Sequence, residues 1–150
     1  MGQDLCDLQR FVAAQATTFD TALSEMRAGR KRSHWMWFIF PQLRGLGRTS
    51  TAQFYGIASL EEARAYLAHP LLGPRLDLVM EEVLATHDRS PEEIFGSPDD
   101  LKFHSSITLF AIASQCQDSP FRDALDRWFT ARMDGRSLAL LGISQEEGLK

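Results

Sequence analysis

Residues 90–100 read SPEEIFGSPDD and contain the Ser-Pro pair twice, at 90–91 and at 97–98. A serine hydroxyl is a preferred N-cap because it accepts a hydrogen bond from a free amide of the first helical turn. Proline suits the next position, where its missing N–H leaves no hydrogen bond unmade. Acidic residues follow both pairs, and the positive end of a helix dipole favours them. The stretch therefore predicts two successive helices, capped by Ser90 and Ser97.

Helix-start signals of the same kind occur on both sides of this stretch. A third Ser-Pro pair stands at 119–120, and Ser59 with Glu62 has the spacing of a capping box. Pro74 and Ser137 also suit the beginnings of helices. Apolar residues recur with helical spacing after these signals and in the N-terminal part of the chain, over 5–12, 19–26, 63–67, 76–84 and 124–129.

The sequence lacks the signals of a sheet. There is no alternating apolar pattern with hairpin turns, and nothing suggests a strand–helix–strand unit. A chain of 150 residues fits one domain. We therefore expect an all-α fold, a compact single-domain orthogonal bundle of short capped helices. The domain should span residues 1–150, with an ordered core over about 5–142.

The aromatic segment SHWMWFIFP, residues 33–41, is ambiguous, because periodicity does not separate a buried strand from a buried helix over so few residues. A single strand would leave its backbone groups without partners, so we expect a short buried helix with Ser33 as cap and Pro41 as terminator. The expected core is one cluster formed by Trp35, Phe38, Leu101, Leu109, Leu125 and Trp128.

Cysteine usage and hydropathy suggest a cytoplasmic protein. Cys6 and Cys116 form neither a disulfide framework nor a metal motif, so both are expected to be free thiols. The longest apolar run, residues 35–40, is far shorter than the roughly 20 residues that cross a bilayer. The N-terminus has no signal peptide pattern. No membrane association is expected, and a monomer is favoured.

Basic residues are concentrated in one segment of an acidic chain. The net charge is −4, yet residues 26–60 contain no acidic residue and six arginines or lysines. Such a segment can attract an anion. The alternative is that acidic residues elsewhere in the chain neutralise it through tertiary contacts.

Other candidate groups favour structural roles. Adjacent carboxylates do not face each other on a helix, and three of the four pairs stand where first helical turns are expected. His69 precedes a proline and suits a turn. Across His34, His69, His87 and His104, no pair has metal-ligand spacing, so no metal and no cofactor are expected.

Two further segments admit a binding role. The loop GLGRTST, residues 45–51, could hold a phosphate at a helix start, although an ordinary loop with a Thr or Ser cap is the favoured interpretation. The triplet at 30–32 lies close to Trp35 and Trp37, as in some nucleic-acid binders. The overall negative charge makes nucleic-acid binding the less favoured function.

The stretch GRKRSHWMWFIFPQL, residues 29–43, resembles the signature of an uncharacterised, mainly bacterial family that is catalogued as a domain of unknown function. That family is sometimes mislabelled calpastatin. Residues 45–48, 69–76 and 94–102, the last running into 105–110, resemble it too. The resemblance covers roughly residues 5–142 and implies a compact, mostly helical domain. It implies no reaction, and the sequence gives the calpastatin label no support, because calpain inhibitors of that kind are disordered and repetitive.

Three functions follow as hypotheses. The first is a cytosolic domain that binds or hydrolyses an anionic, nucleotide-like ligand. The second is a non-enzymatic protein-interaction module that uses the basic face, and the third is nucleic-acid binding. The sequence does not decide whether the protein is an enzyme. The predicted anion site comprises Arg30, Lys31, Arg32, His34, Arg48 and Lys102.

Overall fold

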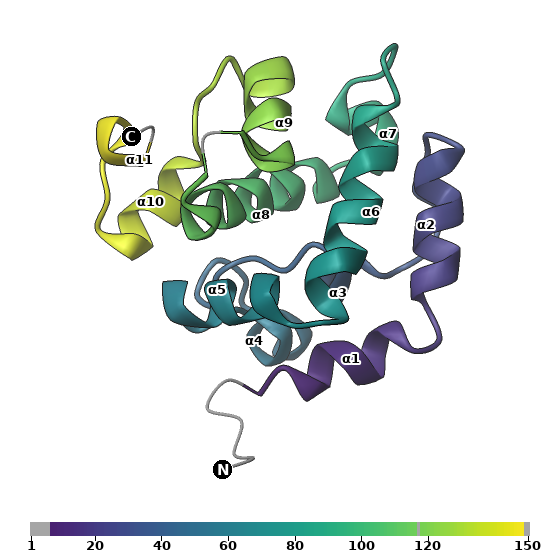
Figure 1. The fold of residues 1–150 in the computed structure, drawn as a ribbon, viewed down its shortest axis with the longest axis horizontal. Helices are drawn as coiled ribbons and strands as arrows, with labels where there is room; N and C mark the ends of the chain where they lie inside the picture. Colours follow the sequence, from purple (N-terminus) through teal and green to yellow (C-terminus); the bar gives the residue numbers. More distant parts are fainter. Residues whose placement is uncertain (1–6, 117, 149–150) are drawn as a thin grey trace.

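Helix α8, Asp99–Ser114, is the central element of the fold and is buried along most of its length (Figure 1). It contacts α3, α5, α7, α9 and α10. Apolar or small residues occur on nearly every side of this helix, and a helix of that composition is stable only when other elements surround it. The rest of the molecule is arranged around it.

The computed structural model describes residues 7–116 and 118–148, and this part of the chain is all-helical. Its helices are α1 Gln9–Gln15, α2 Phe19–Arg27, α3 Met36–Ile39, α4 Ser50–Tyr55, α5 Leu60–Ala68, α6 Leu72–Leu84, α7 Pro91–Phe95, α8 Asp99–Ser114, α9 Pro120–Phe129, α10 Gly135–Leu141 and α11 Gln145–Gly148. The predicted helical class is therefore confirmed. The predicted positions Leu5 and Cys6 lie outside the described residues.

Three of the predicted serine caps are confirmed. The hydroxyls of Ser59, Ser90 and Ser119 each accept a hydrogen bond from the backbone amide three residues later, at 3.1, 3.2 and 3.2 Å. At Ser90 the Glu93 carboxylate accepts the amide of Ser90 in return, which completes a capping box. The same three-residue spacing was visible in the sequence, so local chemistry was sufficient to locate these starts.

The prediction that Ser97 caps α8 is wrong. Pro98 occupies the N-cap position and no side chain caps the helix there. The chain turns at Gly96, whose φ is +79°, and the Gly96 carbonyl accepts the amide of Asp100 at 2.8 Å. The helix therefore begins two residues after Ser97, at Asp99.

The predictions for Ser33 and Ser137 are also wrong, because a nearby carboxylate takes each hydroxyl. Ser33 Oγ donates to Glu25 Oε2 at 2.6 Å, and α3 begins without a side-chain cap. Ser137 Oγ donates to Asp134 Oδ2 at 2.6 Å, and the Asp134 carboxylate itself caps α10. At α10 the carboxylate takes the place of the hydroxyl as the cap, whereas at α3 the Glu25 carboxylate binds Ser33 without capping the helix.

The core matches the prediction except at Leu101. Trp35, Leu109 and Leu125 are buried in one cluster, and Phe38 and Trp128 are partly buried against it. The side chain of Leu101 is 62% exposed, so its predicted place in the core is wrong. Because α8 is apolar on most sides, its periodicity does not mark the first-turn position that faces outward.

Leu43, between α3 and α4, forms a parallel β-bridge with Ile57, which follows α4. Arg44 N donates to Ile57 O, and Ile57 N donates to Gln42 O, both at 2.8 Å. The bridge joins the chain before the Arg48 loop to the chain after α4, so the loop and α4 together form one closed segment. Within the described residues, no helix has the length and hydrophobicity needed to cross a membrane.

Candidate anion-binding pocket

The six predicted site residues do not share one cavity. Arg48 and Lys102 line a cavity of about 400 Å³, which we call the Arg48 pocket. Arg30 and Lys31 line a separate cavity of about 380 Å³, the Arg30 pocket, together with Arg89 and two glutamates. The side chains of Arg32 and His34 are exposed and line neither cavity. Residues 26–60, which we call the acid-free segment, therefore contribute to two separate cavities.

Asp99 lies between the two cavities and binds a lysine from each. Its Oδ2 is 2.8 Å from Lys31 Nζ, and its Oδ1 is 3.4 Å from Lys102 Nζ. Lys31 is nearly buried, so this contact uses its charge for structure. Lys102 remains more open and lies over the Trp37 ring, 4.4 Å from its centroid. Lys102 is thus held by both a carboxylate and an aromatic face.

Glu25 organises the loop that carries the basic triplet. Its Oε1 accepts the amides of Arg32 and Ser33 at 2.8 and 3.0 Å and the Trp35 indole N–H at 2.9 Å. Burial opposes ionisation of this carboxyl. The hydrogen bonds from Ser33, from the two amides and from Trp35 nevertheless lower its pKa from 4.5 to about 2. Glu25, which precedes the acid-free segment, therefore fixes the conformation of residues 32–35 within it.

The acid-free segment was expected either to attract an anion or to be neutralised by acidic residues elsewhere in the chain. Each expectation describes part of the segment. Arg27 and Lys31 are paired with carboxylates from other helices, at 3.1 and 2.8 Å. Among the described residues, the side chains of Arg30, Arg32 and Arg48 form no ion pair. Arg48 is the one of these three that lines the Arg48 pocket, so its charge is directed at a cavity without a carboxylate partner.

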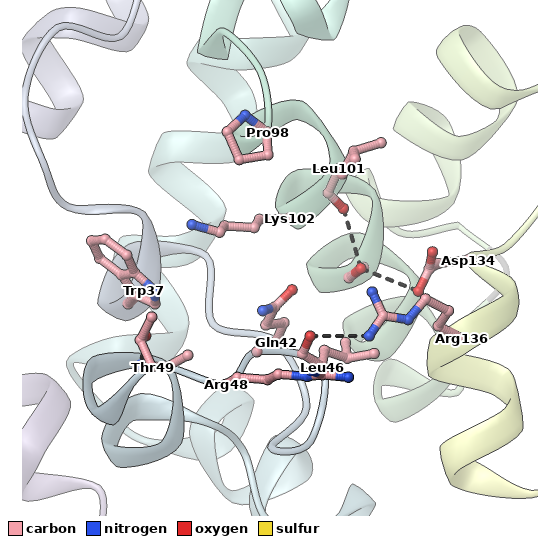
Figure 2. Close-up of a pocket in the computed structure, with 13 residues that line it drawn as sticks. Trp37, Gln42, Leu46, Arg48, Thr49, Pro98, Leu101, Lys102, Asp134 and Arg136 are labelled. Carbon is pink, nitrogen blue, oxygen red and sulfur yellow. Dashed lines mark hydrogen bonds between the residues drawn. The ribbon is translucent and has the colours of Figure 1, made fainter.

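The Arg48 pocket is built by segments far apart in the sequence (Figure 2). Arg48 comes from the loop before α4, Lys102 from the first turns of α8, and Arg136 from the first turn of α10. Among the lining residues these three cations are accompanied by one carboxylate, that of Asp134. The wall is completed by apolar and small polar residues: Trp37, Gln42, Leu46, Gly47, Thr49, Ala52, Pro98, Leu101 and Ser105. The excess of positive charge favours an anionic ligand.

Hydrogen bonds fix several of the lining groups. Arg136 Nη2 donates to Leu46 O at 3.1 Å, which ties α10 to the loop before α4 (Figure 2). Ser105 Oγ donates to Asp134 Oδ2 at 3.1 Å. Thr49 Oγ1 accepts the Ala52 amide at 3.0 Å and caps α4, as the glycine loop predicted. Several groups that line the pocket are thus held in place by the fold itself.

Sequence reasoning missed Arg136 and Asp134 as pocket residues. They stand near the C-terminal end of the described chain, 88 and 86 positions after Arg48. Tertiary contacts bring them to the cavity, that of Arg136 with Leu46 and that of Asp134 with Ser105. The sequence offered one local signal, the spacing from Asp134 to Ser137, which is that of an N-cap and its third helical residue.

The other candidate groups have structural partners. Glu62 holds Arg10 in a buried ion pair at 3.1 Å. His69 Nδ1 accepts the amides of Leu71 and Leu72 at 3.1 and 3.2 Å, so its predicted turn role is confirmed. This contact helps α6 begin before Pro74. Over the described residues, no three His, Cys, Asp or Glu side chains are grouped as a metal site.

Comparisons with known proteins reveal relatives without an assigned activity. Residues 5–141 match a family described as "Protein of unknown function (DUF1810)". The fold is similar to the crystal structure of the conserved hypothetical protein Rv1873 from Mycobacterium tuberculosis, with a TM-score of 0.90. The two sequences are 53% identical, and the match covers 94% of this chain and 100% of the other. No curated protein matches the chain.

Proposed function

The chain belongs to the DUF1810 family of proteins of unknown function, and we propose that it binds a small anionic, nucleotide-like ligand in the Arg48 pocket. One observation carries the proposal. Arg48, Lys102 and Arg136 come from three separate segments and line one cavity of about 400 Å³ that contains a single carboxylate. That volume lies in the range of small-molecule sites.

The arginine side chains suit this role chemically. A guanidinium is planar and presents paired N–H donors that match the oxygens of phosphate or carboxylate. Arg48 forms no ion pair within the described chain, and Arg136 uses Nη2 for the Leu46 carbonyl. The remaining donors of Arg136 are available to a ligand. Relative to the site predicted from sequence, Arg48 and Lys102 are retained and Arg136 is added.

A titration with two simple probes tests the proposal. Inorganic phosphate and AMP should each raise the unfolding temperature, and at 100 times its Kd a ligand stabilises the fold by about 2.7 kcal/mol. Arg48→Gln and Arg136→Gln should each weaken binding by about 10-fold or more, as expected for a lost charged hydrogen bond.

Arg30→Gln is the matched control, because it removes the same charge from the Arg30 pocket. It should leave affinity for both probes within about two-fold of the unmodified protein. Equal losses at Arg30 and Arg48 would mean that the anion senses only the net charge of the surface. Absence of any stabilisation by either probe would refute the proposal and favour a protein-docking role for the basic face.

A further inference from the structure

The carboxylate of Asp134 has one oxygen fully used and the other unused. Oδ2 accepts Ser137 N at 2.9 Å and Ser137 Oγ at 2.6 Å, and it lies 3.1 Å from Ser105 Oγ, which shares its one proton between Oδ2 and the Leu101 carbonyl. Within the described residues, Oδ1 accepts no hydrogen bond and is not a buried unpaired atom. Figure 2 shows this residue beside Arg136, with its bonded oxygen directed toward α8. Oδ1 is therefore the oxygen of this lining residue that is left, within the described chain, for a further donor.

The three bonds to Oδ2 fix the orientation of this acceptor. Asp134 is the N-cap of α10, and its amide donates to Thr108 Oγ1 at 2.8 Å. Rotation of the carboxylate would break the cap and the contact with Ser105. A preorganised acceptor of this kind discriminates strongly between ligands that carry a donor at that point and ligands that do not.

The aromatic wall of the pocket is less suited to a nucleobase. Lys102 Nζ lies over the Trp37 ring at 4.4 Å from its centroid, so one face of the indole is already covered by a cation. Trp37 is therefore better explained as the support that holds Lys102 than as a stacking platform. The polar groups Asp134 and Gln42 line the same cavity, and no side-chain hydrogen bond of Gln42 occurs in the described chain.

We infer that the ligand of the Arg48 pocket is a hydroxyl-bearing phosphate ester, whose phosphate binds Arg48 and Arg136 while a hydroxyl donates to Asp134 Oδ1. This inference rests on the proposed function. Within the described residues Arg48 and Arg136 form no ion pair, and their two positive charges match a phosphate dianion. A sugar phosphate and the ribose phosphate of a nucleotide share this chemistry.

Glycerol 1-phosphate and n-propyl phosphate form a matched pair of probes, because they differ only in two hydroxyl groups. Isothermal titration calorimetry should give about 10- to 100-fold tighter binding of the glycerol ester, the effect expected of a hydrogen bond to a charged group. Ribose 5-phosphate and AMP separate the two sources. A nucleotide ligand requires AMP to bind more tightly than ribose 5-phosphate, whereas a sugar phosphate requires the reverse or equality.

Asp134→Asn is the decisive variant, because asparagine caps helices as well as aspartate does and can keep its oxygen on Ser137. Its amide nitrogen then replaces Oδ1, so an acceptor becomes a donor. The preference for the glycerol ester should fall several-fold, because the ligand hydroxyl can then only accept a neutral hydrogen bond from the amide in place of donating a charge-assisted one, while inorganic phosphate should bind as well or more tightly. Asp134→Ser, which also keeps a capping oxygen, serves if the first variant fails to fold.

The outcomes separate this inference from the proposed function. If phosphate and propyl phosphate bind and respond to Arg136→Gln, but the hydroxyls add nothing, the inference is overturned and the proposed function stands. An unchanged glycerol preference in the Asp134 variants also overturns it. If none of the probes binds the unmodified protein, both fail.

Discussion

The indole nitrogen of Trp35 donates a hydrogen bond to Glu25 Oε1 at 2.9 Å, while the indole ring itself is 1% exposed in the core. One side chain thus connects the hydrophobic cluster to the carboxylate that shapes the 30–35 loop. Burying an indole without a partner for its N–H costs free energy. Glu25 therefore supplies the acceptor that the buried Trp35 side chain needs, in addition to holding the loop. The basic residues of this loop depend on an acid for their arrangement.

This relationship predicts an acid-dependent loss of stability. The pKa of Glu25 is about 2 in the folded protein and 4.5 ordinarily, so the unfolded chain binds a proton first as the pH falls. The contribution is complete above about pH 4.5 and is lost as the pH falls toward 2. Allowing for solvent screening, we expect it to be on the order of 1–2 kcal/mol.

Urea unfolding of the wild-type protein and of Glu25→Gln, each at pH 7 and pH 3, measures this contribution. The difference between the two proteins should be largest at pH 7 and smaller at pH 3. Glu61→Gln is the control for the removal of one surface carboxylate, since Glu61 is exposed and its side chain forms no ion pair within the described residues. A pH-independent gap between wild type and Glu25→Gln would contradict the assignment.

The buried pair of Arg10 and Glu62 predicts a much larger effect. The Arg10 guanidinium contacts both oxygens of Glu62, at 3.2 and 3.1 Å, and both side chains are almost fully buried. Glu62→Ala leaves a buried charge without its partner and should cost about 3–5 kcal/mol in the free energy of unfolding. Glu82→Ala breaks the exposed pair with Arg27 and should cost only about 0–1 kcal/mol.

Urea denaturation in low and high salt distinguishes the buried ion pair from the exposed one. The loss of stability caused by Glu82→Ala should shrink in 1 M sodium chloride, because the Debye length falls to about 3 Å and exposed charges are screened. The loss caused by Glu62→Ala should persist. Equal costs for the two variants would show that Arg10 finds other compensation, such as the carbonyls of Phe54 and Gly56 that it already contacts.

Two serines with the same sequence context should behave differently. Ser90 caps α7, so Ser90→Ala should lower stability by about 0.5–2 kcal/mol. Ser97 caps nothing, and Ser97→Ala should change stability by less than about 0.5 kcal/mol. Thermal unfolding followed by circular dichroism measures both variants. A loss at Ser97 as large as that at Ser90 would be inconsistent with the observed start of α8.

Gly73 should tolerate no side chain. A Cβ built at this position lies 2.1 Å from the Leu67 carbonyl oxygen, so α5 and α6 would have to separate. Gly73→Ala should destabilise the fold by about 1–3 kcal/mol, as overpacking does. At Gly135 a Cβ meets nothing within 4 Å, and Gly135→Ala should stabilise by up to about 1 kcal/mol through helix propensity. Chemical denaturation of both variants tests the sign of each effect.

The sequence predicted local features such as helix caps well, but it did not predict which distant residues meet in the folded protein. Ser59, Ser90 and Ser119 were located because a cap and its amide lie three residues apart. Leu101 was wrongly placed in the core, because the sequence of a helix that is apolar on most sides does not show which apolar side chain is exposed. The charged segment was correctly singled out, but whether its members converge depends on contacts such as that of Arg136 with Leu46. No local pattern encodes a contact across 90 residues.

The burial of α8 has a consequence for the motions of the pocket. Its residues from Phe103 to Ala113 are almost all shielded from water, so their backbone amides should exchange hydrogen only when the whole protein opens. The first turns of this slowly exchanging helix carry Lys102 and Ser105, which line the Arg48 pocket. One wall of the pocket therefore belongs to the most persistent part of the molecule. A ligand bound there should slow exchange throughout α8, and not only in the loop around Arg48.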